Sequence, residues 1–493
     1  MMSSTKVNRL TWLVTLLVIS FALVWMRARL NFNGPYLDES NYLFVGKTLL
    51  DGGVWQTHTY IFSSDFPLYV FGVGDAFAGL IGARAIAAIL GICSLVLYFD
   101  AVRRFLRSQQ VALFATTLLA LSASHGFISK FAVYDIVCFV SFVAGLWALS
   151  LAYTRSGYQA QTWAFIASLC LVTAFLSKYV IFLEMPLIGL MILIYRPQLA
   201  FALFTPALII GFGYGYHYRA DLQILYQQQI VTAHGNNASY AEILRVTLGY
   251  VWPILLLFIF EFKQHWQRTG GHSRNQAMFR WSMWLALPII LYHLRAHDLI
   301  SFYKHIVYSV VFLAPLASVY LVRLLRQKNN YIAQLPALIL IVVAIQGMFQ
   351  IRAIENAYPD GRDAVAFLKD TIGANSTVLS EDPYLLRHQL RNQIKANHIY
   401  ENAWFDNDGD QKHTREDVIA GVWDGKFDFL YLDGRITPVT TEKLRKYVVQ
   451  NKYKLIYQQP YHTSSVMFYQ TEGKIEIYQR REPYSGQYPL IPQ

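Results

Sequence analysis

Residues 134–153 read YDIVCFVSFVAGLWALSLAY, a run in which the one charged side chain is Asp135, near the beginning. A helix of about 20 mostly apolar residues is long enough to cross the hydrocarbon core of a bilayer. Further apolar runs lie near residues 10–26, 76–98, 111–128, 162–177, 179–195, 200–216, 246–262, 280–293, 305–322 and 331–350. The sequence therefore predicts a polytopic α-helical membrane protein with about 11 transmembrane helices.

The composition divides the chain into two parts. Of its 493 residues, 55% are hydrophobic and 15% are charged, whereas about a quarter of a soluble domain is charged. Residues 1–350 hold 24 bases and 12 acids, and residues 351–493 hold 18 bases and 19 acids. These numbers exclude a single soluble globule, a disordered chain and a fibrous repeat, and they predict a membrane domain over 1–350 followed by a soluble domain over 351–493. The three cysteines lie in apolar runs and indicate neither disulfides nor a metal site.

The distribution of charge predicts the orientation in the membrane. If the N-terminus is cytoplasmic and the spans alternate, the inner segments contain 14 bases and two acids, and the rest of the first 350 residues contains ten of each. This excess of inner bases is typical of a membrane protein and explains the net charge of +11 without a nucleic-acid partner. The run at 10–26 lacks a small-residue cleavage site, so we expect an uncleaved first helix. Eleven spans place the C-terminal domain outside the cytoplasm, and we expect the protein in a bacterial inner membrane.

Two outer loops and the C-terminal part have recognisable structure. The loop over 27–75 contains a predicted helix from Tyr36 to Leu50, which follows Pro35 and ends at Gly52-Gly53. A second long outer loop covers about 217–245. The residues after 350 alternate between helix-like and strand-like patterns, which predicts a small extracytoplasmic α/β domain. Its expected elements are a helix from Asp363, strands at 376–380 and 427–433, a helix at 443–450, and a hairpin of 465–469 with 474–478.

Acidic residues near the membrane are candidates for a functional site, because charge is costly there. Asp38 and Glu39 follow the first span, Asp65 precedes the second, and Asp135 opens the fourth. In the predicted topology all face the outer side, where they could supply a general base or a metal ligand. Asp38 and Glu39 could equally serve the first turn of a helix, and Asp65 could cap the helix that follows. Asp135 favours function, since a lone acid entering an apolar span needs a partner.

Basic residues on the same side form a second group of candidates. They are Arg84, Lys178, Arg295, Lys304 and His305. As a cluster they suit a lipid-linked phosphate, whose charge lies at headgroup level. Any one of them alone could instead extend its charged end to the lipid headgroups. His293, His297 and His305 are more typical of packing or hydrogen-bonding residues than of ligands, and they would share one helical face only if the helix ran unbroken.

These motifs resemble the GT-C membrane glycosyltransferases. The resemblance lies in four elements, namely Asp38-Glu39-x-x-Tyr42, Asp65-Phe66-Pro67-Leu68, Asp135 and Lys304-His305-x-x-Tyr308 with Pro315 beyond it. By pattern the chain is similar to the protein O-mannosyltransferases and the lipid A aminoarabinose transferase, over residues 10–350. The C-terminal part resembles the extracytoplasmic domains of bacterial members.

The resemblance implies a polyprenyl-phosphate sugar donor and an inverting transfer, on the outer face of the membrane, to a glycan, lipid or protein acceptor. It implies that Asp38, with Glu39 as the alternative, deprotonates the acceptor, and that Asp135 helps to orient the site. Tyr42 and Tyr308 are then expected to contact substrate.

The resemblance also bears on metal and phosphate. Asp65 matches a metal-contacting acid, so a divalent cation is the candidate cofactor, although the sequence does not fix one. The lysine that follows this acid in the aminoarabinose transferase is Phe66 here. Lys178, Arg295 or Lys304 would then have to supply its contact with the lipid phosphate.

Two other classes of function compete with this interpretation. A transporter or flippase for a lipid-linked glycan would need charges along a path through the membrane, and usually an inverted repeat. A non-catalytic scaffold whose C-terminal domain binds glycan would need no catalytic base. The sequence has no evident repeat, and its charges gather toward one face, which favours the enzyme.

The charge distribution leads to a test of topology. A reporter enzyme fused after Gln493 should be active outside the cytoplasm, whereas a reporter inserted in 263–279 should be active inside. Alkaline phosphatase and β-lactamase fusions measure this directly. Activity of the 263–279 insertion on the outer side would contradict the predicted orientation.

Overall fold

The computed structural model describes residues 13–14, 16–18, 20–21, 24, 27–54, 65–226, 238–268, 281–299, 301–403, 405–409, 413–449, 452–464 and 470–481. The chain separates into two compact units. The membrane unit consists of residues 1–30 and 48–351, and the C-terminal unit consists of residues 31–47 and 352–493.

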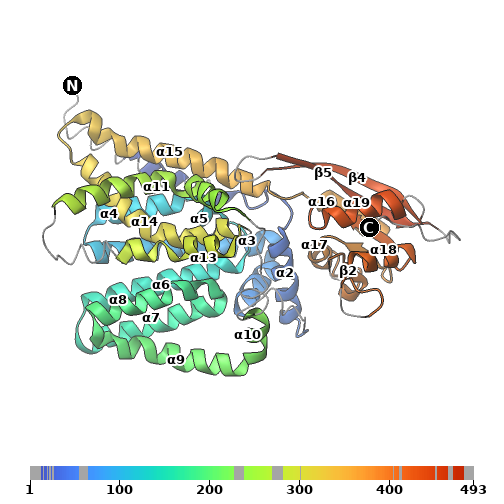
Figure 1. Ribbon diagram of the computed structural model, residues 1–493, viewed down its shortest axis with the longest axis horizontal. Coiled ribbons are helices and arrows are strands. Elements are labelled where there is room, and N and C mark those ends of the chain that lie inside the picture. The colour runs from blue at the N-terminus through green and yellow to red at the C-terminus, as the bar shows by residue number, and fades with distance from the viewer. Residues whose placement is uncertain are drawn as a thin grey trace. The chain divides into compact units, whose positions relative to one another are not determined.

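The membrane unit is a bundle of helices (Figure 1). Its α-helices are α3 (Phe66–Leu106), α4 (Gln109–Leu121), α5 (Ala123–Ile128), α6 (Tyr134–Thr154), α7 (Gly157–Ser177), α8 (Met185–Tyr195), α9 (Ala200–His217), α10 (Arg219–Tyr226), α11 (Tyr240–Arg268), α13 (Pro288–Ala296), α14 (Phe302–Leu325) and α15 (Asn330–Glu355). Short 3₁₀ helices, η1 (Tyr179–Leu183) and η2 (Pro197–Leu199), flank α8. Helix α3 is kinked where Ala78 and Gly79 leave helical geometry, with Gly79 at a positive φ that suits glycine.

Within the described residues, seven helices are long and apolar enough to cross a membrane. This confirms a mostly helical membrane protein, but not the expected count of 11 spans. Two of the differences have local causes. The run at 111–128 is split at Ser122, whose side chain caps α5, and the run at 280–293 is interrupted before Pro288, which begins α13. The run at 10–26 and the loop at 263–279 lie partly outside the described residues.

Two helices form the centre of the membrane unit. Most of α6 and of α14 is buried, whereas α9 is largely exposed, as expected of a helix that faces lipid. Helix α6 packs against α3 and α7, and α14 packs against α4, α5 and α11. The figure shows α6, α7 and α9 side by side (Figure 1). Side chains at the ends of α6 and α14 are therefore held in a rigid setting.

The C-terminal unit contains a five-stranded sheet of order β2-β1-β3-β5-β4. Its strands are β1 (Val378–Ser380), β2 (Ile399–Glu401), β3 (Phe429–Leu432), β4 (Tyr453–Ser464) and β5 (Gln470–Arg480). The first three are parallel, with Val378 opposite both Ile399 and Phe429, and β5 runs antiparallel to β3 and β4. The predicted small α/β domain is present.

Helices cover both faces of this sheet. They are α16 (Arg362–Thr371), α17 (Pro383–Gln389), α18 (Arg415–Trp423) and α19 (Pro438–Leu444). Val378 and Phe429 contribute to a core with α16 and α17, whereas Leu379 and Leu430 contribute to a second core with α18 and α19. Because successive residues of a strand point to opposite faces, these cores lie on opposite sides of the sheet.

The helix predicted in the first outer loop is α2 (Leu37–Leu50), and the segment that leads into it is part of the C-terminal unit. The Asn33 side-chain amide donates to the carbonyls of Glu355 and Tyr358, at 3.1 and 3.2 Å. The ring of Tyr36 lies 5.3 Å from that of Tyr358. Residues more than 300 positions apart thus form one folded body.

The predicted elements of this unit are largely found, with two corrections and four omissions. The helix predicted at 443–450 begins earlier, as α19 at Pro438, and residues Arg445–Val449 after it form a π-helix. The hairpin pairs β5 with β4 at 453–464, whereas the sequence pattern placed the first strand at 465–469, which lies outside the described residues. Strand β4 was missed because Pro460 lies within it and a register shift between Leu455 and Tyr457 breaks its alternation. The short strand β2 and the helices α17 and α18 were also not predicted.

Candidate active site

A buried carboxylate with two lysines lies at one end of the helical bundle. Asp135 is in the first turn of α6, Lys178 follows the last residue of the antiparallel α7, and Lys304 is in the first turn of α14. The Lys178 ammonium donates to Asp135 Oδ1, and the Lys304 Nζ lies 3.9 Å from Asp135 Oδ2. Each of the three residues is less than 5% exposed. Two ammonium groups thus face one carboxylate in a buried setting.

A pair of histidines extends this cluster. His293 Nδ1 lies 2.8 Å from the carbonyl oxygen of Asp298, so it must carry the proton that it donates. In a neutral His293, Nε2 then accepts from His305 Nδ1, 3.0 Å away. Within the part of the chain that the structure describes, His305 Nε2 and Asp135 Oδ2 are buried without a hydrogen-bond partner. Buried polar atoms are usually satisfied, so these two atoms are suited to meet a ligand.

Of the five bases that the sequence suggested for a phosphate site, the structure brings three together in this cluster. Lys178, Lys304 and His305 come together, whereas Arg295 is exposed at the end of α13. Arg84 is fully buried, donates to the carbonyl of Leu30 at 2.7 Å, and lies over the ring of Phe131. His297 adopts a left-handed backbone conformation that ends α13, so it does not continue the helical face of His293.

Both tyrosines expected to contact substrate are buried. The Tyr308 hydroxyl donates to the thiol of Cys138 at 3.0 Å, and its ring packs against Phe139 and Phe142. Tyr42 is 3% exposed. Packing accounts for Tyr308 without a substrate, and the role of either residue in binding stays a prediction.

Asp38 and Glu39 belong to the C-terminal unit, and the structure distinguishes between them. Glu39 is fully buried, and its Oε2 accepts from the backbone N–H of Tyr36 at 2.9 Å. This is the reciprocal half of a capping box, in which the third helical residue reaches back to the N-cap. Asp38 is only partly buried. Glu39 therefore serves as a capping residue, while Asp38 also lies in the first turn of the helix.

Asp65 occupies the N-cap position of α3 but makes no side-chain capping bond, and it is exposed. Helix capping therefore does not account for this acid. Its expected role as a metal ligand stays a prediction.

One buried acid was missed by sequence reasoning. Glu184 lies between η1 and α8, is fully buried, and neither of its carboxylate oxygens has a hydrogen-bond partner in the described part of the chain. The signal was available, because a lone acid in the apolar run Phe182-Leu-Glu-Met-Pro186 is as unusual as Asp135.

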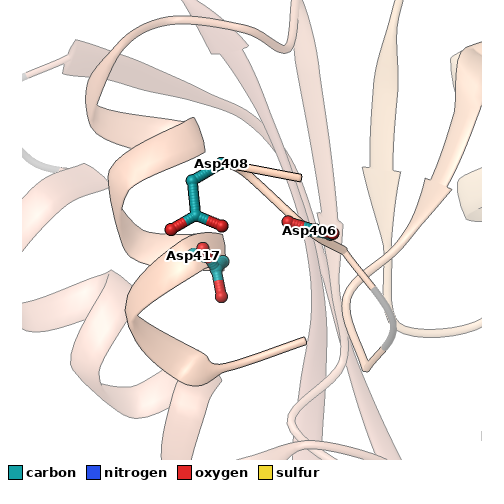
Figure 2. Close-up of side chains that lie close together, drawn as sticks. All are labelled: Asp406, Asp408 and Asp417. Atoms are coloured by element: carbon teal, nitrogen blue, oxygen red, sulfur yellow. The ribbon is translucent and has the colours of Figure 1, made fainter. Parts of the chain in front are cut away.

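A second group of carboxylates lies in the C-terminal unit (Figure 2). Oxygens of Asp406, Asp408 and Asp417 lie within 4.8 Å of one another, the one such group among the residues described. Asp417 completes the capping box of α18 by accepting from the N–H and hydroxyl of Thr414, which lower its pKa. Asp406 accepts from the N–H of Gly409 at 2.7 Å. These bonds explain two of the three carboxylates by the local fold.

Comparisons with known proteins agree with this architecture. A family model for dolichyl-phosphate-mannose-protein mannosyltransferases matches residues 9–225. Among curated protein sequences, none matches the chain.

Solved structures of low sequence identity share the fold over almost the whole chain. ArnT from Cupriavidus metallidurans bound to undecaprenyl phosphate is similar with a TM-score of 0.62 and 13% identity, over 94% of this chain and 97% of that one. The archaeal oligosaccharyltransferase AglB from Archaeoglobus fulgidus, in complex with an inhibitory peptide and a dolichol-phosphate, is similar with a TM-score of 0.55 and 12% identity, over 95% and 74%. The fold is GT-C-like, as the motifs predicted. Together the family match and these structures support a membrane glycosyltransferase.

The buried cluster leads to a prediction about stability. Asp135→Asn leaves two buried ammonium groups without their counter-charge, which should cost about 3–5 kcal/mol, as for other broken buried ion pairs. The double variant Asp135→Asn/Lys178→Met should be more stable than Asp135→Asn alone, because one uncompensated charge is gone. Thermal unfolding of the purified protein in nanodiscs measures the difference. Additive losses in the double variant would contradict the pairing.

Proposed function

We propose that the chain transfers a sugar from a polyprenyl-phosphate donor to a hydroxyl of an acceptor, at the outer face of the membrane and with inversion at the anomeric carbon. The observation that carries the proposal is the buried Asp135, Lys178 and Lys304 cluster, in which two cations face one anion. The two ammonium groups are hydrogen-bond donors that suit the phosphate of a lipid-linked donor. The match to the mannosyltransferase family and the fold shared with ArnT and AglB support the same chemistry.

In the proposed reaction the acceptor oxygen forms a bond to the anomeric carbon while the bond from that carbon to the donor phosphate breaks. The electron pair leaves on the phosphate, and Lys178 and Lys304 stabilise the charge that develops there. The acceptor proton passes to a carboxylate, which makes the hydroxyl a competent nucleophile. A single displacement of this kind inverts the configuration and needs no covalent intermediate.

Asp38 is the proposed general base. Glu39 is fully buried and accepts a hydrogen bond from the backbone N–H of Tyr36. Asp38, in the same helical turn, is only partly buried. An acid that must receive a proton from an incoming substrate needs this access.

The location of the Asp135, Lys178 and Lys304 cluster supports a site over a transport path. Asp135, Lys178 and Lys304 stand at the ends of α6, α7 and α14, at one end of the bundle. A path for a lipid-linked glycan would need polar groups along the length of these helices.

We place this end of the bundle at the outer face of a bacterial inner membrane, with the N-terminus in the cytoplasm and the C-terminal unit outside it. The support is the 14 bases and two acids of the inner segments.

The proposed phosphate site predicts unequal roles for two bases. Lys304→Met should weaken binding of undecaprenyl phosphate by roughly tenfold or more, since a buried charge-assisted contact contributes about 1.5–3 kcal/mol. Arg295→Met should have a smaller effect that disappears at high salt, because Arg295 is exposed. Native mass spectrometry measures lipid binding, and the thermal midpoint reports folding. A folded Lys304→Met protein with the affinity of the parent would place the phosphate elsewhere.

The proposed base is tested by a matched pair of isosteric variants. Asp38→Asn removes the proton acceptor, so turnover should fall by about 100-fold or more while donor binding is retained. Glu39→Gln removes a neighbouring charge but can keep the capping bond, since glutamine serves in capping boxes. This control should keep most of the activity. The measurement is transfer of radiolabelled sugar from a polyprenyl-phosphate donor by the reconstituted protein.

The same two variants also define the results that would contradict Asp38 as the general base. An active Asp38→Asn protein together with an inactive but folded Glu39→Gln protein would exchange the roles of the two acids. If both variants keep full activity, the base is neither residue.

A further inference from the structure

The C-terminal unit contains a polar pocket that the proposed reaction does not use. Its volume is about 140 Å³, several times the roughly 30 Å³ that one water molecule occupies in the liquid. Every lining residue belongs to this unit, and the residues come from the start of α2, from the turn before α16, and from the loops after β1 and β3. They are Pro35, Tyr36, Leu37, Tyr358, Pro359, Asp382, Leu385, Tyr431, Asp433, Arg435 and Ile436.

The pocket lies where an α/β sheet of this topology opens. Strands β1 and β3 are adjacent and parallel. The chain leaves β1 for α17 on one face of the sheet, and it leaves β3 for α19 on the other. The two loops therefore diverge at the carboxyl ends of the strands, and such switch points are where open α/β sheets bind ligands.

A buried glutamate holds the walls of the pocket in place. Glu381 accepts hydrogen bonds from the backbone N–H groups of Asp433, Gly434 and Thr437, at 2.6, 2.5 and 3.0 Å. It also accepts from the Thr437 hydroxyl at 2.7 Å. Gly434 has a φ of 73°, a conformation that glycine adopts without strain. The loop after β3 is thus fixed to the loop after β1 before any ligand arrives.

Two further acids face the pocket. One oxygen of Asp382 caps α17 by accepting from Leu385, and one oxygen of Asp433 accepts from the N–H of Arg435. Burial raises the pKa of Asp382 to about 6. Burial and the nearby Glu381 carboxylate raise the pKa of Asp433 well above its ordinary value. A ligand that donates hydrogen bonds would stabilise both carboxylates in their ionised form.

The opposite wall is aromatic. Tyr36 and Tyr358 lie with their ring centroids 5.3 Å apart, and the Arg435 guanidinium lies 5.8 Å from the centre of the Tyr358 ring. The Tyr358 hydroxyl donates to the carbonyl of Gly34 at 3.3 Å, which fixes the ring. These rings offer apolar faces beside the carboxylates, and Arg435 offers donors.

The side chains that line the pocket favour one class of ligand. At neutral pH an ionised Asp382, with its pKa of about 6, balances the charge of Arg435, so these walls offer no excess positive charge to hold a phosphate or another anion. Hydroxyl or ammonium groups can donate to the carboxylates, and aromatic rings can cover the C–H face of a sugar ring. Leu37, in the wall of the pocket, is the residue before Asp38.

We propose that this pocket binds a neutral or amino sugar unit of the acceptor, with its hydroxyl or ammonium groups donating to Asp382 and Asp433 and its ring against Tyr36 and Tyr358. That the bound sugar belongs to the acceptor rests on the proposed function, whereas sugar binding itself does not.

Binding is measured on the full chain in nanodiscs, because detergents with sugar headgroups would compete. The probes are methyl α-mannopyranoside, methyl β-glucopyranoside, glucosamine and inorganic phosphate, followed by saturation-transfer NMR. We expect at least one of the sugars to bind and phosphate not to bind. Asp433→Asn should weaken sugar binding by tenfold or more, whereas Asp370→Asn, which changes an exposed acid of α16, should not. Absence of sugar binding, or binding of phosphate alone, would overturn the proposal.

A second variant covers the case in which Asp433→Asn does not fold. Ile436 lines the pocket and is 38% exposed, so Ile436→Trp can fill the cavity without disturbing a core. It should abolish sugar binding and leave binding of undecaprenyl phosphate as in the parent. Sugar binding that survives in a folded Ile436→Trp protein would overturn the assignment of the pocket.

Transfer assays separate this proposal from the proposed function. If the parent binds sugar but transfers none, the sugar site stands and the enzymatic proposal fails. If the parent is active, Ile436→Trp should raise the KM for the acceptor at least tenfold with little change in the KM for the donor. An unchanged acceptor KM in a variant that has lost sugar binding would overturn the acceptor assignment.

Discussion

The burial of Asp135 is the constraint on which the membrane unit depends. A carboxylate removed from water costs several kcal/mol unless opposite charge and hydrogen bonds compensate it. The compensation comes from Lys178 at the end of α7 and Lys304 at the beginning of α14, so three helix ends that are distant in sequence must meet. Because α6 and α14 are also the most deeply buried helices, the same contacts that order the bundle build its polar site. The two lysines that meet at Asp135 also give the cluster its proposed use.

In the C-terminal unit, too, buried acids both hold the fold together and line a candidate binding site. Glu381 joins the loops after β1 and β3 through four hydrogen bonds, and Asp382 and Asp433 line the pocket beside it. The segment from Asn31 to Lys47 lies between two membrane spans in the sequence, yet it folds with the residues after 351. As a result, the helix that carries Asp38 and one wall of the pocket are parts of a single folded body. The proposed base and the proposed sugar pocket therefore belong to the same compact unit.

Sequence reasoning succeeded where the deciding interactions are local. Apolar runs predicted most long helices, and Pro35 with Gly52 predicted α2 to within a residue. It failed where a single polar contact ends a helix, as Ser122 does by capping α5 within a continuous apolar run. In the site, Asp135 was identified because charge in an apolar span is costly. Glu184 satisfies the same criterion, so the sequence alone contains the signal for this buried acid.

The sequence by itself determined that this is a polytopic membrane protein with a soluble α/β part, since hydropathy and charge are properties of each segment alone. It also determined the set of charged residues from which a site could be built. Only the tertiary structure decided that Lys178 and Lys304 meet Asp135 while Arg295 stays exposed, and that Glu39 caps α2 while Asp38 does not share that bond. It alone revealed the pocket between the loops after β1 and β3. The physical reason is that partners separated by tens or hundreds of residues are chosen by packing, and packing depends on every helix and strand at once.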